Sequence, residues 1–275
     1  MKILITGGNG NIAKMINKNL SNKYEIVNLS RTDLNVLSFE EVKKYIENNN
    51  FDILVHTAIL GGRRTKEENG DVTHKNLLML ENLLYFADRF KMIINFDSAA
   101  IYDRNTDILN RKEEDLSTIP TDYYGFSKYV IYKRTLQYEN VFNFRIFNIF
   151  HPNEEEDRFM KQCFIAKKKN TIVNIFEDKW FDFVYENDFI KIIDFYFSNI
   201  NNKNNLEKTI NICYKEKYKL SDIAKLIVNK SNINVLNKNS SNNYSGNGEK
   251  LNKLGLELIG LNKSLTLYND VFFHS

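Results

Sequence analysis

A glycine-rich turn near the start of the chain constrains the fold more than any other stretch. Residues 2–6 are apolar and β-branched, which predicts a short buried strand. The strand leads directly into Gly7-Gly8-Asn9-Gly10-Asn11-Ile12-Ala13, and a helical pattern continues to Leu20. Glycines let the backbone turn tightly and approach a diphosphate, and the following helix N-terminus offers N–H groups to it. The turn therefore predicts a dinucleotide site, with an ordinary glycine-rich turn as the alternative.

Composition narrows the class of protein. The 275 residues are enough for one large or two small domains, and the net charge of +3 without a dense basic patch argues against a nucleic-acid partner. The most apolar late stretch, residues 189–200, contains Lys191 and Asp194 and is too short to span a bilayer. Cys163 and Cys213 lack metal-ligand spacing and predict free thiols in a reducing compartment. Because no signal peptide precedes the glycine turn, we expect a cytoplasmic protein.

Strands and helices alternate along the first half of the chain. Periodicity predicts strands at 2–6, 24–29, 52–56, 92–96 and 141–147, and helices at 39–49, 73–90 and 123–138. This alternation is typical of an α/β fold with a parallel, doubly wound sheet, whose ligands lie at the carboxyl ends of the strands. The polar stretches 63–72 and 103–120 are predicted to be loops.

The second half of the chain has a looser rhythm. We expect further helices at 154–169, from 187 and at 221–229, and further strands at 171–176, 182–185 and 209–213. The Asn- and Ser-rich stretch 232–249 predicts a mobile surface loop.

The end of the second predicted strand bears on the choice of cofactor. The strand is followed by Ser30-Arg31-Thr32-Asp33. In a dinucleotide fold an acid at this point favours NAD through the ribose hydroxyls, whereas an Arg can pair with the 2′-phosphate of NADP. Arg31 therefore indicates NADPH, although a solvated surface Arg is the alternative and Asp33 lies close enough to favour NAD. Small residues at Thr57 and Ala58, after the third strand, would let the cofactor pass closely.

A tyrosine and a lysine in the helix predicted at 123–138 can carry acid–base chemistry. Tyr124 and Lys128 are four residues apart and share one face of that helix. A tyrosine can protonate a carbonyl oxygen as hydride reaches the carbon, if its pKa falls from about 10 toward neutrality, and an ammonium favours that fall. Ser98, after the fourth strand, can hydrogen-bond the same oxygen. An exposed, inert helix pair is the alternative.

At this point the chain resembles the extended short-chain dehydrogenases/reductases. The matching segments are Thr6-Gly7-x-x-Gly10-x-x-Ala13, Asn76, Ser98, Tyr124-x-x-x-Lys128, residues 145–152 and residues 182–188. Within this group it is most similar to nucleotide-sugar enzymes of the GDP-fucose synthase kind, through residues 31–35, 58–62 and 75–79. The resemblance implies a Rossmann-like dinucleotide-binding domain over residues 1–150. It also implies a smaller α/β substrate domain, mainly residues 151–275, with some segments returning to the first.

The resemblance also assigns roles to individual residues. It implies that Ser98, Tyr124 and Lys128 form the catalytic set, that Lys128 also holds the nicotinamide ribose, and that Arg31 meets the NADPH phosphate. The full set of expected cofactor contacts is Gly7, Gly10, Asn11, Ile12, Arg31, Leu34, Asn35, Thr57, Ala58, Tyr124 and Lys128. The expected partner is a nucleotide-diphosphate sugar, and a homodimer is the candidate assembly.

Departures from the family pattern separate the activities. Ala100 stands where the GDP-fucose synthases carry a catalytic Cys, and residues 153–170 contain no His that could be its partner. Ala99-Ala100 also replaces the Asp-Glu pair of the sugar dehydratases. The expected activity is therefore NADPH-dependent reduction of a 4-keto-6-deoxy nucleotide sugar. A 4-epimerase with tightly held NAD and a non-catalytic NADP-binding regulator are the alternatives.

The predicted substrate domain gives weaker indications. Phe181 stands where the family often has an Arg near the substrate phosphates. Lys167, Lys168 and Lys169 are candidate phosphate contacts, with a solvated helix end as the alternative. Trp180 could stack on a base or serve only in packing.

Overall fold

The computed structural model describes residues 1–63, 67–237, 239 and 241–274. The chain divides into two compact units. The first unit comprises residues 1–103, 116–145 and 190–210, and the second comprises residues 104–115, 146–189 and 211–275. Each unit is therefore built from separate stretches of the sequence. Part of the loop predicted at 63–72, residues 64–66, lies outside the described residues.

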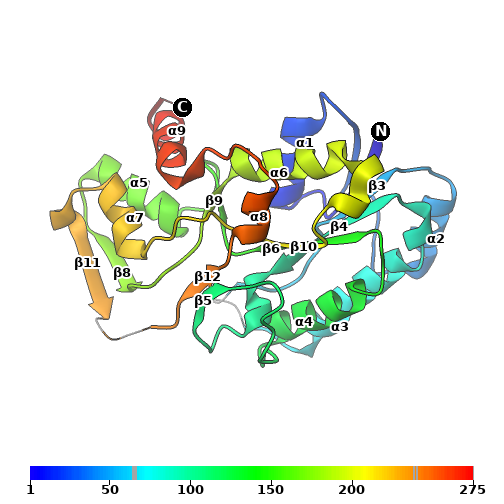
Figure 1. The fold of residues 1–275 in the computed structure, drawn as a ribbon, viewed down its shortest axis with the longest axis horizontal. Coiled ribbons are helices and arrows are strands. Elements are labelled where there is room, and N and C mark those ends of the chain that lie inside the picture. Colours follow the sequence, from blue (N-terminus) through cyan, green and yellow to red (C-terminus); the bar gives the residue numbers. More distant parts are fainter. Residues whose placement is uncertain (64–66, 238, 240, 275) are drawn as a thin grey trace. The chain divides into compact units, whose positions relative to one another are not determined.

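A six-stranded sheet forms the centre of the first unit (Figure 1). Its strands are β1 (Lys2–Thr6), β2 (Glu25–Leu29), β3 (Ile53–His56), β4 (Met92–Ser98), β6 (Val141–Ile146) and β10 (Thr209–Ile212). They lie in the order β10-β6-β4-β3-β1-β2, and β1 pairs in parallel with both β2 and β3, as β3 does with β4. This architecture confirms the predicted α/β class with a doubly wound sheet. The strand order reverses direction between β1 and β3, which is where such sheets hold their ligands.

Helices cover both faces of this sheet. The helices are α1 (Asn11–Leu20), α2 (Phe39–Glu47), α3 (Gly70–Leu84), α4 (Tyr123–Thr135) and α6 (Glu186–Ser198), with short 3₁₀ turns η1 (Ala87–Arg89), η2 (Ala99–Tyr102) and η3 (Ile200–Asn205). Figure 1 shows α3 and α4 side by side below the sheet and α1 and α6 above it. Every residue of β3 and β4 is buried, as expected for parallel strands covered on both faces.

Side-chain caps fix where three of these helices begin. The side chains of Ser38, Asn69 and Asp122 accept hydrogen bonds from first-turn N–H groups of α2, α3 and α4, respectively. The prediction placed the start of α3 at Thr73, three residues too late, because the polar stretch before it conceals the Asn69 cap. The prediction also ran this helix to residue 90, whereas α3 ends at Leu84 and η1 follows.

The second unit consists of short paired strands and small helices. The strands are β5 (Ile108–Arg111), β7 (Ile149–Phe150), β8 (Val173–Glu177), β9 (Val184–Tyr185), β11 (Ile233–Asn237) and β12 (Tyr244–Gly246). They form the pairs β11–β8, β12–β5 and β7–β9. The helices are α5 (Phe159–Lys169), α7 (Leu220–Ile227), α8 (Glu249–Lys253) and α9 (Gly260–His274), with the turn η4 (Lys230–Asn232).

Two loop predictions in this unit are wrong. The stretch 232–249 contains β11 and β12, and the stretch 103–120 contains β5. In β11, positions 233, 235 and 237 are partly buried and the two positions between them are exposed. Because only one face of this strand is covered, it needs few apolar residues, and its sequence reads as polar. Tyr244, Ser245 and Gly246 of β12 are all buried. The predicted helix at 154–169 also begins later, at Phe159.

Two further features bear on the expectations from composition. Cys163 and Cys213 are both buried free thiols, as predicted. Among the helices in the described parts of the chain, none has the length and apolar character needed to cross a membrane.

Candidate active site

The glycine turn lies at the point where the strand order reverses. Gly7 has φ = 77°, and a Cβ at this position would lie 2.6 Å from the Ala58 nitrogen, directly after β3. A Cβ on Gly8 would lie 2.8 Å from the carbonyl carbon of Leu29, at the end of β2. The Gly8 N–H donates to the Leu29 carbonyl over 2.7 Å. The turn is thus held between the carboxyl ends of β2 and β3, with no space for a side chain at Gly7 or Gly8.

The helix that follows the turn presents its N-terminus there. Gly10 is the N-cap of α1 and provides no side-chain cap, and the first turn contains no acidic residue. The first N–H groups of a helix have no partner within the helix and carry a partial positive charge. Asn11 is exposed and Ile12 is partly buried at this end. The N-terminus of α1 can therefore accept an anionic group such as a diphosphate.

The end of β2 contains the two residues that bear on cofactor choice. Arg31 is exposed. The Asp33 carboxylate accepts hydrogen bonds from the Ser30 hydroxyl at 2.6 Å and the Ser30 N–H at 2.9 Å. These bonds hold the pKa of Asp33 below its ordinary value, and they turn its carboxylate back toward its own strand end. Both side chains are exposed, but the Asp33 carboxylate is engaged by Ser30.

The other expected cofactor contacts differ in exposure. Thr57 and Ala58 are partly buried after β3, and the Thr57 hydroxyl donates to the Thr6 carbonyl over 2.6 Å. Asn35 is also partly buried, and its N–H donates to Glu41. Leu34 is only 4% exposed and packs in the apolar core under α2 and α3. Its side chain serves the core, which leaves at most its backbone for a cofactor.

Lys128 is a buried cation below the end of β4. Its ammonium donates to the Phe96 carbonyl over 2.6 Å and lies 5.7 Å from the centre of the Tyr124 ring. Burial lowers the pKa of Lys128 to about 8, while the nearby Asp97 carboxylate acts in the opposite direction. A buried cation next to a phenol, with a pKa lowered by burial, is typical of a catalytic site.

Ser98 is the last residue of β4. Its hydroxyl accepts a hydrogen bond from the Ala100 N–H at 3.2 Å and so caps the turn η2. The turn packs against α4, and a Cβ on Gly125 would lie 2.8 Å from the Ala100 carbonyl oxygen. Ser98 directly precedes η2, and Tyr124 and Lys128 belong to α4, which packs against η2. The structure therefore brings these three residues to the same end of β4.

A buried ion pair, which the sequence analysis did not identify, supports this strand end. Arg145 is fully buried on β6, and its Nε donates to Asp97 over 2.7 Å. Burial alone would lower the pKa of Arg145, but Asp97 and the Tyr102 hydroxyl raise it above its ordinary value. The other Asp97 oxygen accepts from the Ser98 N–H at 2.8 Å. Neither pattern nor spacing indicated this pair, because a charged residue in a buried strand has a partner only in three dimensions.

His56 ends β3 and belongs to the same buried region. Its Nδ1 lies 2.9 Å from the Thr6 hydroxyl. Burial, and secondarily the Lys128 charge, lower the pKa of His56 to about 3. The imidazole is therefore neutral near pH 7.

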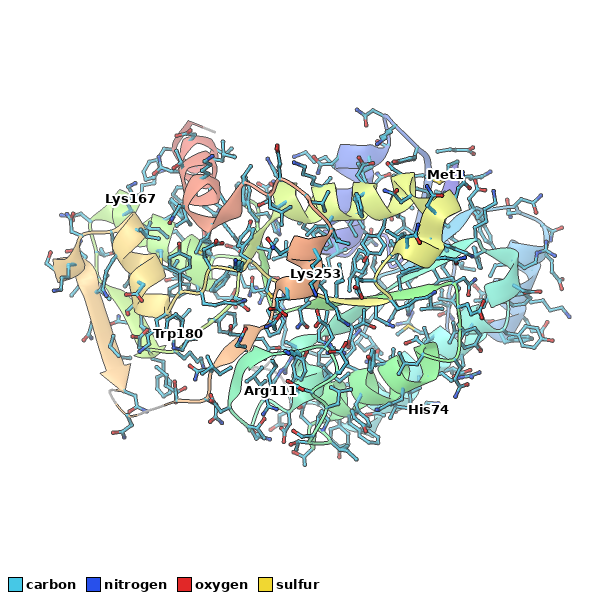
Figure 2. The ribbon with its side chains drawn as sticks, in the orientation of Figure 1. Met1, His74, Arg111, Lys167, Trp180 and Lys253 are labelled. Carbon is cyan, nitrogen blue, oxygen red and sulfur yellow. The ribbon has the colours of Figure 1, made fainter. Side chains whose placement is uncertain are left out.

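Two candidate substrate residues of the second unit, Trp180 and Lys167, contact neighbouring side chains. Figure 2 labels Trp180, between β8 and β9; its ring lies 5.8 Å from the Lys219 ammonium. Lys167, also labelled, lies in the last turn of α5 and donates to Asn269 over 2.7 Å. Asp182 accepts from Lys217 at 2.8 Å and from the Gly246 N–H at 2.8 Å. Burial raises the pKa of Asp182, against the effect of Lys217.

Comparison with known proteins places this chain among enzymes. The model of the NAD dependent epimerase/dehydratase family matches residues 3–213. GDP-L-colitose synthase of Yersinia pseudotuberculosis is 24% identical over 256 residues, which cover 82% of this chain and 81% of that protein.

Solved structures share the fold over nearly the full chain. A dTDP-4-dehydrorhamnose reductase from Clostridium acetobutylicum superposes with a TM-score of 0.82 at 18% identity, covering 99% of this chain and 100% of the other. GDP-mannoheptose C4 reductase from Campylobacter jejuni, with NADP bound, superposes with a TM-score of 0.78 at 18% identity, covering 100% and 98%.

Proposed function

Because the chain belongs to the NAD dependent epimerase/dehydratase family, we propose that it is an NADPH-dependent reductase of a 4-keto-6-deoxy nucleotide sugar. The observation that carries this proposal is the buried Lys128 ammonium beside Tyr124 at the end of β4. The cofactor, when bound, supplies the hydride that reduces the keto carbon. The glycine turn without space for a Cβ and the N-terminus of α1 fit the diphosphate of such a cofactor.

Tyr124 serves as the proton donor in this proposal. Its hydroxyl protonates the keto oxygen as negative charge develops there, which leaves a phenolate on the protein. The positive charge of the Lys128 ammonium favours the phenolate. Burial lowers the pKa of Lys128, and the negative charge of Asp97 acts in the opposite direction, which helps to keep the lysine protonated. The Ser98 hydroxyl donates to the same oxygen and stabilises the alkoxide-like transition state.

The residues after Ser98 support reduction over the related reactions. Ala99 and Ala100 are both fully buried in η2 and have no ionisable side chain. An acid–base residue at these positions, which dehydration or epimerisation beside the ketone would use, is therefore missing. Two of the similar proteins are named as reductases of a dTDP-4-dehydro sugar and of a GDP-heptose.

Cofactor choice follows from the end of β2. Arg31 is exposed and can meet a 2′-phosphate, whereas Asp33 is held by Ser30. This arrangement supports NADPH over NAD. It also counts against the alternative of a 4-epimerase, which keeps NAD bound through its cycle.

The second unit is the proposed site for the nucleotide-diphosphate part of the substrate. Which base and sugar it takes is the object of the test. A homodimer stays a prediction.

The test is an NADPH-consumption screen of the purified full-length chain against 4-keto-6-deoxy sugars on GDP, dTDP, UDP and CDP. We expect one nucleotide series to be reduced, with consumption of one NADPH per sugar. Stoichiometric NAD released on denaturing the purified protein, together with interconversion of 4-hydroxy sugars without added cofactor, would instead establish the epimerase.

A further inference from the structure

Two consecutive glycines lie directly against the ring of Tyr124. Gly61 and Gly62 have φ angles of 79° and 91°, in the region that favours glycine. A Cβ on Gly62 would lie 3.0, 3.1 and 3.3 Å from Cζ, Cε2 and Cε1 of Tyr124. Because Cζ bears the hydroxyl, the Gly62 backbone is packed against the reactive end of the ring.

One carboxylate fastens this glycine segment to the helix that contains Tyr124. The Glu68 Oε1 atom accepts from the Gly62 N–H at 2.5 Å, and its Oε2 atom accepts from the Tyr124 N–H at 3.2 Å. At Gly61 the φ angle of 79° strains any residue other than glycine, and a Cβ there would lie 2.7 Å from Glu68 Oε1. Glu68 is partly buried, and its negative charge at the N-terminus of α4 is favourable.

We propose that Gly62 and Glu68 are positioning residues for Tyr124. The proposal rests on the proposed function, since it concerns the proton donor of that reaction. The two carboxylate oxygens of Glu68 hold the backbone N–H groups of Gly62 and Tyr124 at a fixed separation. The Cα of Gly62, which has no side chain, limits how far the Tyr124 ring can tilt. Proton transfer depends on donor placement, and a misplacement of about 1 Å can cost roughly a hundredfold in rate.

The residue types follow from this role. Glu68→Gln retains the shape of the side chain but replaces one acceptor oxygen with an NH₂ group, which cannot accept a hydrogen bond. One of the two bonds to Gly62 and Tyr124 is therefore lost. Gly62→Ala instead retains both acceptors and places a methyl group against the ring.

The experiment follows the ring and the turnover separately. 3-Fluorotyrosine is introduced at position 124 of the full chain, and its ¹⁹F resonance is recorded with and without NADP⁺. Steady-state kcat and KM are measured on the same variants with Tyr124 unmodified. Matched controls are Gly70→Ala, where a Cβ would meet nothing within 4 Å, and Glu67→Gln, whose side chain is exposed.

We expect Gly62→Ala and Glu68→Gln to shift or broaden the ¹⁹F resonance and to lower kcat at least about tenfold with a smaller change in KM. The controls should retain both the resonance and the rate. Wild-type resonances in both variants would overturn the proposal. The resonance decides the point even if no nucleotide sugar is reduced, so failure of the proposed function is recognised separately. If Gly62→Ala fails to fold, Glu68→Gln still tests the proposal, because the Gln side chain has the same size as the Glu side chain.

Discussion

The glycine turn after β1 and the buried charge cluster of Lys128, Asp97 and Arg145 are two differently built parts of the candidate site in the first unit. The turn is made of backbone, and its neighbours approach to within 2.6–2.9 Å of where a Cβ on Gly7 would lie. The cluster is made of ionisable side chains that are each 5% exposed or less. The turn is therefore sensitive to added volume, whereas the cluster is sensitive to removed charge or hydrogen bonds.

This difference separates binding from chemistry. Backbone N–H groups and a helix end can hold a diphosphate without taking part in a reaction. The charge cluster, by contrast, places a cation beside a phenol at the cost of burying that cation, as the lowered pKa of Lys128 shows. Substitutions in the turn should change affinity and stability, and those in the cluster or at Tyr124 should change rate and the dependence on pH.

The largest effect is expected for Tyr124→Phe. The ring and its packing are retained, so the variant should fold and bind NADPH as the wild type does. Loss of the hydroxyl removes the proposed acid, which should lower kcat by about 10²–10⁴. Stopped assays of sugar reduction measure the rate, and fluorescence titration measures NADPH affinity.

Tyr123→Phe is the matched control for this substitution. Tyr123 is 47% exposed, and one residue along a helix turns the side chain by about 100° away from its neighbour. Its activity should be unchanged. An inactive Tyr123→Phe beside an active Tyr124→Phe would place the proton donor one residue earlier and remove the role of Lys128.

Lys128→Met should change how stability depends on pH. The folded pKa of Lys128, about 8, is below the ordinary value of 10.5, so below pH 8 the folded protein bears a buried charge. Between pH 8 and 10.5 the unfolded chain binds the extra proton, and wild-type stability gains about 3 kcal/mol from this group as the pH rises. The variant lacks this gain.

Urea unfolding of both proteins without cofactor at pH 7, 8.5 and 10 measures the difference. The stability of Lys128→Met relative to the wild type should fall across this range, because the other titrating groups cancel. Parallel stability curves would show that Lys128 titrates as an ordinary exposed lysine.

Gly7→Ala should distort the turn without changing the buried charge cluster. A non-glycine residue at φ = 77° is strained, and the added Cβ meets the Ala58 backbone, so we expect a loss of about 1–3 kcal/mol in stability. NADPH affinity should fall as well, since the turn must move. Gly70→Ala, with open space around its Cβ, is the control and should retain both properties. A Gly7→Ala protein with wild-type unfolding and affinity would contradict the steric account.

The same contrast explains what the sequence could predict. The strands of the central sheet were predictable because each is a short, mainly apolar run between turn signals, and predicted and observed ends of β1 to β4 differ by at most two residues. The glycine turn was equally visible, because its function depends on consecutive residues. Tyr124 and Lys128 were visible because a helix brings positions four apart together.

The unpredicted parts depend on contacts between distant positions. β5 and β12 pair although Ile108 and Tyr244 are far apart in the chain, and neither strand has a strong apolar pattern of its own. Glu68, in the segment before α3, accepts a hydrogen bond from the Tyr124 N–H of α4. Arg145 on β6 donates to Asp97 on the neighbouring strand β4. No local periodicity records such partners, so the structure was needed to find them.

The smallest effect is expected for Arg31→Ala, which tests the cofactor side of the comparison. A charged hydrogen bond to a phosphate contributes about 1.5–3 kcal/mol, and because Arg31 is exposed we expect the lower end, roughly a tenfold loss of NADPH affinity. NADH lacks the 2′-phosphate, so its affinity should change little. Titrations of both cofactors at low and high salt measure these affinities, and the NADPH effect should shrink as salt screens the exposed charge.

Arg89 is another exposed arginine of the same unit and provides the control, since Arg89→Ala should leave both affinities unchanged. Equal losses of NADPH and NADH affinity in Arg31→Ala would show that this side chain supports the strand end and does not distinguish the phosphate.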